Sequence, residues 1–282
     1  YSLGALISYK SNDLFFIKNF FVGYIIIFLI ELATVLTNEY YDLEGDRLNK
    51  NPGRFTGGSR MLVENRVSLK EVNLAFIFVI LSFLLFSFYL LKLTYFSNNV
   101  LILLILGMIF GIYYTAPPLK LSYRGVGEID VAFTHGFYII ICGYVFQKRI
   151  IDSPIIFILS LPIFFSSLAI VSLGGIPDLE SDRLVSKKTL VSLIGPKNTL
   201  FFSIFCILIT GLIGTYLYHL FFSWKLNSLY LLLPIYSIYL SYIFLSKLRL
   251  KNYEISISKM IFRGMVLIAL SSFIPLIIYG SS

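Results

Sequence analysis

Two short acidic segments contain the residues best suited to chemistry. Residues 41–48 read YDLEGDRL and residues 177–184 read PDLESDRL, so Asp-Leu-Glu-x-Asp-Arg-Leu occurs twice. In each copy two aspartates stand four residues apart, which on a helix places both carboxylates on one face about 6 Å apart along the axis. Asn38 extends the spacing upstream of the first pair. Oxygen ligands of this kind suit Mg²⁺, which proteins commonly hold with one or two carboxylates plus substrate phosphates.

Two carboxylate clusters suit one highly charged anion. If Asp42 and Asp46 face Asp178 and Asp182, the four side chains can hold a diphosphate through bridging Mg²⁺. The metal offsets the repulsion between carboxylates and phosphate, and it stabilises the negative charge on a departing pyrophosphate. Basic residues near the motifs are candidates to complete the site, although each also fits the positive charge expected on the cytoplasmic side. They are Arg47, Arg60, Lys120, Arg124, Arg183, Lys187 and Lys188.

The two copies differ upstream of the aspartates. Asn38 and Glu39 of the first copy align with Gly174 and Gly175 of the second, so the second copy lacks the amide ligand. The Gly-Gly-Ile-Pro run ending at Pro177 predicts a local break in the helix just before the carboxylates.

Glu31 is an acidic residue within an apolar segment. It lies seven residues before Asn38, on nearly the same helical face and about 10 Å deeper along the axis. An ionisable residue inside a membrane span is a functional hypothesis by default, because unpaired burial costs several kcal/mol. Two roles remain open: binding the polar group of an acceptor substrate, or a structural hydrogen bond to a neighbouring helix.

The composition indicates the elements that position these residues. The chain is 57% hydrophobic and 13% charged, with a mean hydropathy of +0.85, whereas about a quarter of the residues in soluble domains are charged. Residues 1–9 look like the end of a further helix, and the chain begins at Tyr1 without Met, so we expect the front of that helix to be missing. We predict an all-α, multi-pass membrane protein forming a single domain over 1–282. Apolar runs long enough to cross a bilayer lie at 15–40, 72–94, 99–116, 128–147, 153–175, 200–222, 228–246 and 260–279.

The basic residues predict the orientation. If residues 1–9 end a first span, 17 of the 23 Lys and Arg residues fall on the side that carries both acidic motifs. Such an excess marks the cytoplasmic side. Topology therefore explains the net charge of +8, and no compact basic stripe suggests nucleic-acid binding. An ion-coupled secondary transporter remains a distant alternative, although its carboxylates would be expected near the bilayer midplane rather than at helix ends.

The motifs resemble those of the UbiA superfamily of intramembrane aromatic prenyltransferases. NEYYDLEGD (38–46) is similar to the family's first signature, Asn-Asp-x-x-Asp-x-x-x-Asp, and the second copy resembles its Asp-x-x-x-Asp motif. YTAPPLKLSYRGVGE (114–128) resembles the segment between the family's fourth and fifth helices. The resemblance implies a bundle of nine transmembrane helices around a central cavity, which the partial helix at 1–9 would complete, with the acidic motifs facing the cytoplasm.

The resemblance also implies roles for individual residues. Glu39 stands where the family usually has Asp, and Gly175 stands where a further acid is often found. Tyr114 and Lys120 match the family's Tyr-x-x-x-Lys element only loosely, because they are six residues apart. The implied metal-binding residues are Asn38, Asp42 and Asp46 for one Mg²⁺–diphosphate contact, and Asp178 and Asp182 for the other. The four aspartates are also the implied catalytic residues.

The implied reaction is Mg²⁺-dependent transfer of a prenyl group from a prenyl diphosphate to an aromatic acceptor. Aromatic faces steady a cation by about 0.5–2 kcal/mol each, and the candidates nearest the motifs are Tyr40, Tyr41, Tyr113 and Tyr114. The run FTGGSRMLVENRVS (55–68) and the DLESDR form of the second motif resemble the 1,4-dihydroxy-2-naphthoate branch, in the menaquinone pathway. Homogentisate, 4-hydroxybenzoate and an archaeal glycerophosphate lipid remain alternative acceptors.

Overall fold

Helices form every regular element in residues 1–49, 57–248 and 257–281, which are the residues that the computed structural model describes. α5 (Asn98–Tyr113) is an apolar helix shorter than a full span, and α1 (Ser2–Asn12) is a helix of 11 residues. The all-α, membrane-spanning prediction is confirmed, whereas the count of nine spans stays a prediction. Among the described residues, seven helices are long and apolar enough to cross a membrane: α2 (Ile17–Tyr41), α4 (Leu69–Leu93), the continuous α6–α7 segment (Gly127–Lys148), α8 (Ile155–Leu184), α10 (Pro196–Leu220), the α11 segment (Asn227–Lys247) and α12 (Ile257–Ser281).

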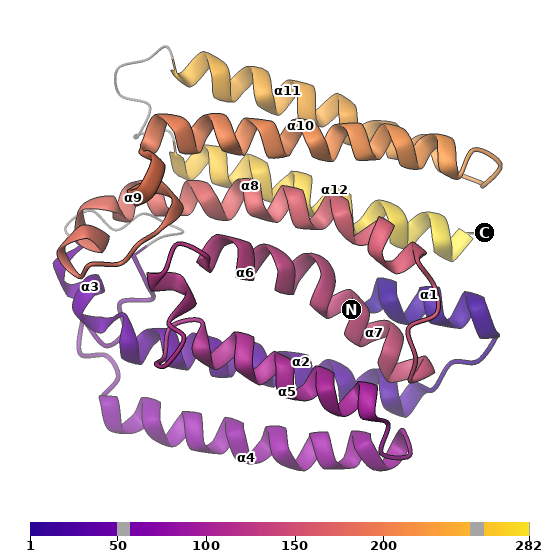
Figure 1. Cartoon of the computed structure of the whole chain (residues 1–282), viewed down its shortest axis with the longest axis horizontal. Coiled ribbons are helices and arrows are strands. Elements are labelled where there is room, and N and C mark those ends of the chain that lie inside the picture. The colour runs from indigo at the N-terminus through magenta and orange to yellow at the C-terminus, as the bar shows by residue number, and fades with distance from the viewer. Residues whose placement is uncertain (50–56, 249–256, 282) are drawn as a thin grey trace.

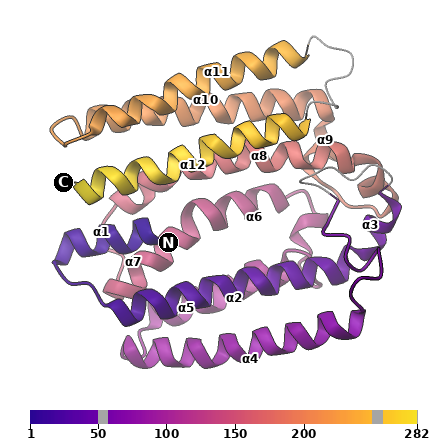
Figure 2. The ribbon, with the colours of Figure 1, turned by 180° about the vertical axis from the view of Figure 1, so that it is seen from behind.

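The long helices lie side by side, and their connections gather at two ends (Figures 1 and 2). The short helices α3 (Leu43–Leu48) and α9 (Leu190–Ile194) lie together at one end. The α1–α2 turn and the C-terminus lie at the opposite end. α8 packs against α10, α12 and α6, and α3 packs against α8. The two acidic motifs, which are distant in sequence, therefore reach the same end of the bundle.

Apolar packing and lipid-facing surface explain these helices. The core between them is built from fully buried aliphatic and aromatic side chains such as Ile26, Leu159 and Leu200. On α4, by contrast, Phe78 is 70% exposed and Leu85 is 67% exposed, as expected where the neighbouring medium is lipid. Exposed apolar surface of this extent is unusual on a soluble chain. The bundle is therefore consistent with a multi-pass integral membrane protein.

The two motif segments differ from the predicted helix ends. The break predicted before the second motif is wrong: α8 continues through Pro177 to Leu184. Proline removes one backbone hydrogen bond, but packing against three neighbouring helices holds α8 in one piece. The bend falls instead in the first motif, where α2 ends and Asp42 adopts φ −91° and ψ 0° before α3 begins. Four residues that enter the orientation argument, Lys50, Arg54, Arg249 and Lys251, lie outside the described residues, as do Phe55 and Thr56 of the 55–68 run.

Candidate functional site

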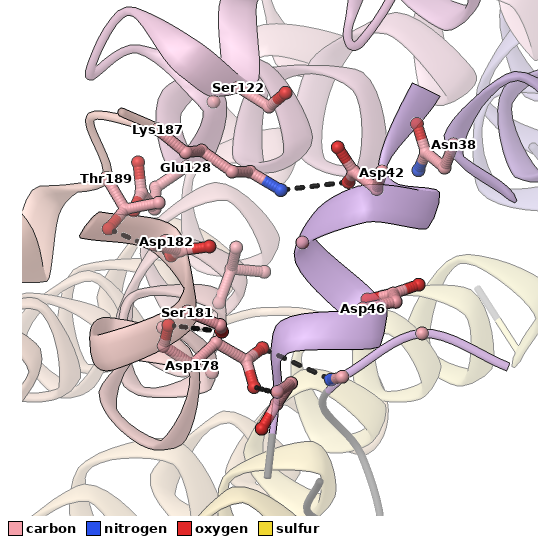
Figure 3. A pocket seen from close by; sticks show the side chains of 18 of the residues that line it. Asn38, Asp42, Asp46, Ser122, Glu128, Asp178, Ser181, Asp182, Lys187 and Thr189 are labelled. Atoms are coloured by element: carbon pink, nitrogen blue, oxygen red, sulfur yellow. Dashed lines mark hydrogen bonds and ion pairs between the residues drawn. The ribbon is translucent and has the colours of Figure 1, made fainter. Parts of the chain in front are cut away.

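Both acidic motifs line one cavity of about 430 Å³ at the end of the bundle that carries α3 and α9 (Figure 3). The first motif reaches it from the end of α2 and from α3, and the second from the last turns of α8. The predicted juxtaposition of the two motifs is therefore present in the structure. The predicted residues that line the cavity are Asn38, Glu39, Asp42, Asp46, Tyr114, Asp178, Asp182 and Lys187.

The bend between α2 and α3 preserves the predicted spacing of the first motif. The Asp42 N–H donates to the Asn38 carbonyl at 2.8 Å, and the Asp46 N–H donates to the Asp42 carbonyl at 2.9 Å. The backbone bonds thus keep the i, i+4 pattern across the bend. The Asn38 side-chain oxygen accepts a hydrogen bond from the hydroxyl of Thr115, so the α5 connector orients the amide.

Asp42 is held by two donors from other parts of the chain. The Lys187 ammonium lies 2.8 Å from one carboxylate oxygen, and the Tyr123 hydroxyl donates to the other at 2.8 Å (Figure 3 shows the lysine contact). Burial favours the neutral amine of Lys187, but the charge and the hydrogen bond of Asp42, together with Asp182, outweigh it and raise the pKa of Lys187 above its ordinary value. Lys187 therefore stays protonated inside the cavity.

Asp178 of the second motif is held by neutral donors. One oxygen accepts a hydrogen bond from the Asn49 side-chain amide at 2.8 Å, and the other accepts from the Gly57 backbone N–H at 3.2 Å. The Ser181 hydroxyl donates to the backbone carbonyl of Asp178 at 2.9 Å. Asn49 and Gly57 follow the first motif in sequence, so the chain after one motif positions a carboxylate of the other.

Asp46 lies where a charged carboxylate is unfavourable. Burial raises its pKa to about 6, with further contributions from the nearby charges of Asp42 and Glu39. Gly58, with φ +69°, passes so close that a Cβ there would lie 2.0 Å from an Asp46 oxygen. The cavity thus concentrates negative charge that a bound cation would relieve.

The lining residues fit a metal that arrives with a phosphate ligand. Within the described residues, no group of three His, Cys, Asp or Glu side chains forms a metal site. The motif residues nevertheless offer oxygen atoms, which Mg²⁺ prefers, and Mg²⁺ is usually held by one or two carboxylates while water and substrate phosphates complete its shell. The donor chemistry and the uncompensated charge at Asp46 both suit such an ion.

The comparison with protein families agrees with this site. The family model described as the UbiA prenyltransferase family matches residues 2–266. The chain belongs to the UbiA prenyltransferase family. A curated relative, UbiA prenyltransferase domain-containing protein 1 of Dictyostelium discoideum, is 29% identical over 101 residues, which are 36% of this chain and 30% of that protein. The matched segment therefore spans under a third of this relative's length.

Solved UbiA structures share the fold over nearly the whole chain. The Archaeoglobus fulgidus UbiA homologue bound to DMAPP and Mg²⁺ gives a TM-score of 0.66 at 16% identity, covering 98% of this chain and 94% of that one. The apo homologue from Aeropyrum pernix K1 gives 0.70 at 13%, covering 98% and 95%. A structure described for digeranylgeranylglyceryl phosphate synthase gives 0.68 at 20%, covering 99% and 91%. At these identities the likeness is one of fold.

Most of the predicted basic residues lie outside the lining of the UbiA motif cavity. Lys187 lines it, while the Lys120 ammonium lies 5.2 Å from the centre of the Tyr123 ring. Arg60 donates to the backbone carbonyl of Asp46 at 3.2 Å. The exposed basic residues outside the lining are Arg47, Arg124, Arg183 and Lys188. Of the four tyrosines considered for cation stabilisation, Tyr114 lines the cavity, and Tyr40, Tyr41 and Tyr113 do not.

Several lining residues were not predicted from the sequence. Glu128 is 7% exposed, and its carboxylate accepts a hydrogen bond from the Leu190 N–H at 2.8 Å, at the start of α9. Thr189 donates to Asp182 at 3.4 Å, a long bond. Glu128 and Tyr123 both lie in the 114–128 segment noted for its UbiA resemblance. That resemblance was the signal that could have identified them.

Glu31 lies in a second cavity deeper in the bundle. This cavity, of about 220 Å³, shares Asn38 and Tyr114 with the motif cavity. Glu31 is exposed, and none of the described residues forms a hydrogen bond or ion pair with its carboxylate. The acceptor-binding role of Glu31 therefore stays a proposal. Within the described residues, no neighbouring helix supplies the hydrogen-bond partner that the structural alternative requires.

Proposed function

We propose that this chain transfers a prenyl group from a prenyl diphosphate to a hydroxylated aromatic acceptor in a Mg²⁺-dependent reaction. The observation that carries the proposal is that both acidic motifs line one cavity with the Lys187 ammonium between them. Membership of the UbiA prenyltransferase family supports the reaction class. The A. fulgidus homologue bound to DMAPP or to GPP together with Mg²⁺ supports the donor and the metal.

The motif residues would hold the metal and the diphosphate. The metal ligands would be Asn38, Asp42, Asp46, Asp178 and Asp182. Bound Mg²⁺ supplies the positive charge that offsets the diphosphate and stabilises the departing pyrophosphate. Lys187, protonated and inside the cavity, can donate a hydrogen bond to a diphosphate oxygen in place of Asp42. The remaining proposed contributors to substrate binding are Glu39, which lines the cavity, Arg60, which donates to the Asp46 carbonyl, and Lys120, Arg124, Arg47 and Arg183.

The apolar wall of the motif cavity protects the reacting carbon. Ile170, Val171, Ile261 and Met265 line the cavity together with the motifs. An allylic carbon that loses diphosphate becomes cation-like and reacts with water, so excluding water favours attack by the acceptor ring. Tyr114 lines both cavities, and its ring face can steady the developing positive charge by about 0.5–2 kcal/mol.

The acceptor is proposed from two separate likenesses. The motif resemblance nominates 1,4-dihydroxy-2-naphthoate or a related quinone precursor, with homogentisate and 4-hydroxybenzoate as other rings. The fold likeness to digeranylgeranylglyceryl phosphate synthase favours a glycerophosphate lipid as the second candidate. The excess of Lys and Arg on the motif side supports an active site that opens to the cytoplasm.

The test uses the full chain purified in detergent or lipid nanodiscs. Geranylgeranyl diphosphate is offered with Mg²⁺ and a panel of the four acceptors, and products are identified by mass spectrometry while pyrophosphate is measured. We expect prenylated product and pyrophosphate in equal amounts, both lost with EDTA and restored by added Mg²⁺. Absence of pyrophosphate release with every acceptor, combined with ion-driven uptake of one of these compounds into proteoliposomes, would establish the transporter alternative.

A further inference from the structure

The backbone that follows the second motif is held on both sides of Lys187. The Lys187 N–H donates to the Asp182 carbonyl at 2.8 Å, and the Lys188 N–H donates to the Tyr123 carbonyl at 3.2 Å. Between the end of α8 and Lys187 the chain turns at Ser186, which has φ +56°. A left-handed backbone at a residue other than glycine is uncommon and here marks a tight turn. These contacts fix the backbone of Lys187 beside the motif cavity and leave its side chain as the part that can change partner.

The Lys187 ammonium stands among carboxylic acids. Within the described part of the chain, Lys187 is the only residue with a basic side chain in the lining of the motif cavity. It lies 2.8 Å from an Asp42 oxygen, and the side chains of both residues are 18% exposed. Removing one partner of a largely buried pair leaves a costly unpaired charge. The acidic residues of the lining are Glu39, Asp42, Asp46, Glu128, Asp178 and Asp182.

Both Asp42 carboxylate oxygens already accept from a donor of the protein. Lys187 contacts one oxygen, and the Tyr123 hydroxyl donates to the other at 2.8 Å. A divalent cation that binds Asp42 competes with the ammonium for the same carboxylate. If the cation displaced it, the protonated Lys187 would be left beside a doubly charged ion, and like charges repel strongly in a partly buried site. A cation that arrives alone is therefore disfavoured at Asp42.

An anion that arrives with the cation removes this conflict. A diphosphate oxygen offers the ammonium a new acceptor when Asp42 turns to the metal. Tyr123 can hold the ammonium during this change, since the Lys187 Nζ also lies 5.2 Å from the centre of the Tyr123 ring, within the range of a cation–π contact. The exchange thus requires rotation of one side chain and no change of the backbone.

We propose that Lys187 is an internal counter-ion of Asp42 that disfavours a divalent cation arriving alone and admits it together with a diphosphate, to which the ammonium moves. The proposal rests on the proposed function for the identity of the anion. It assigns two opposite effects to one lysine, which weakens the binding of the metal alone and strengthens the binding of the diphosphate. By linkage, the metal and the diphosphate then strengthen each other's binding by the same factor.

The test measures the binding of a cation with and without the anion. The full chain is kept in a non-ionic detergent, which has no phosphate groups to bind the cation. Mn²⁺, which takes the same oxygen ligands as Mg²⁺, is added alone, and the free ion is followed by its electron paramagnetic resonance signal. A second titration measures the dissociation constant of an unreactive thiolo analogue of geranyl diphosphate at a fixed Mg²⁺ concentration. Neither measurement needs turnover or an acceptor.

Lys187→Met should change the two dissociation constants in opposite directions. We expect Mn²⁺ alone to bind about tenfold more tightly than to wild type, because the competing ammonium is gone. The analogue should bind about tenfold more weakly, because the anion loses a charged donor. Lys187→Arg keeps the charge and should keep the weak Mn²⁺ binding of wild type. Lys188→Met is the matched control, exposed and outside the lining, and should change neither constant.

Four results would overturn the proposal: no gain of Mn²⁺ affinity in folded Lys187→Met, no loss of analogue affinity in that variant, an equal Mn²⁺ gain in Lys188→Met, or an equal gain in Lys187→Arg. If Lys187→Met does not fold, Lys187→Gln, which keeps a donor without the charge, should show both changes, and their absence would count equally against the proposal.

The outcome is separate from that of the proposed function. Failure of prenyl transfer with every acceptor, together with both expected changes in Lys187→Met, would reject the proposed function and leave the counter-ion role standing. Prenyl transfer by wild type, together with unchanged Mn²⁺ binding in Lys187→Met, would reject the counter-ion role alone.

Discussion

The two acidic motifs are nearly the same in sequence and differ in structure. The first motif bends at Asp42, between α2 and α3. The Asp42 carboxylate is held by the Lys187 ammonium and the Tyr123 hydroxyl. The second continues without a break to the end of α8, and Asp178 is held by two neutral N–H donors. Identical spacing has therefore been built on two different backbones.

The difference shows that each motif depends on the other. Lys187, five residues after Asp182, neutralises Asp42, while Asn49, three residues after Asp46, orients Asp178. Asp42 has its charge balanced by Lys187, whereas Asn49 and the Gly57 N–H orient Asp178 as hydrogen-bond donors. The segment after the second motif thus supplies, through Lys187, a positive group that an arriving anion can take over from Asp42.

The largest expected effect comes from neutralising either motif. Asp42→Asn and Asp178→Asn should each lower kcat/KM for the prenyl diphosphate on the order of a thousandfold, because the charge that holds the metal is lost. Glu44→Gln and Glu180→Gln are matched controls within the same repeats, exposed and outside the lining. The assay is Mg²⁺-dependent pyrophosphate release, with gel filtration to confirm folding. Full activity in either folded aspartate variant would remove that motif from the mechanism.

A smaller effect should follow from removing the charge that balances the first motif. Lys187→Met should raise the KM for the prenyl diphosphate roughly tenfold to a hundredfold, the usual range for a hydrogen bond to a charged group. Its neighbour Lys188 is exposed and does not line the cavity, so Lys188→Met should be close to wild type. Equal effects in the two variants would mean that the lysines act through general positive charge rather than through the contact with Asp42.

The sequence predicted the site most accurately where the spacing of residues along one helix determines which side chains lie together. The i, i+4 aspartates share a cavity because that spacing survives both a bend and a proline. The predicted break before Asp178 failed because Gly and Pro propensities act locally, while packing around α8 is a tertiary effect. Propensity alone could not show which motif bends.

Contacts made by connecting segments were the hardest to predict. Seven basic residues were candidates for the site, but the sequence does not tell which one turns inward, and Lys187 is the one found in the lining. Asn49 and Glu128 were missed because their partners, Asp178 and the Leu190 N–H, lie more than sixty residues away. Nor could periodicity predict the π-helical turn Thr134–Tyr138, because such a turn shifts the helical register by a single residue.

A moderate effect is expected at Glu128, where two substitutions should distinguish a positioning role from a role for the carboxylate charge. Glu128→Leu leaves the partly buried Leu190 N–H without its acceptor, which should cost about 1 kcal/mol or more of stability. Because Leu190 begins α9 just after Lys187 and Thr189, we also expect a several-fold rise in the KM for the prenyl diphosphate with kcat nearly unchanged. Glu128→Gln keeps an accepting oxygen and should restore both values. A loss of kcat in Glu128→Gln would instead indicate that the carboxylate charge itself takes part in the reaction.

The smallest expected effect concerns the arginine that follows the aspartates in each copy. Arg47 and Arg183 were candidates for diphosphate binding from their place in the repeat, yet both are exposed and neither lines the cavity. Exposed charges are screened within about 10 Å at moderate salt, so Arg47→Ala and Arg183→Ala should each raise the KM for the prenyl diphosphate less than about threefold, and added salt should remove the difference. A salt-resistant tenfold rise of the KM in one variant would mean that this arginine turns into the cavity when the diphosphate binds. The motif that carries it would then close over the diphosphate, while the other motif would keep the arrangement seen in the structure.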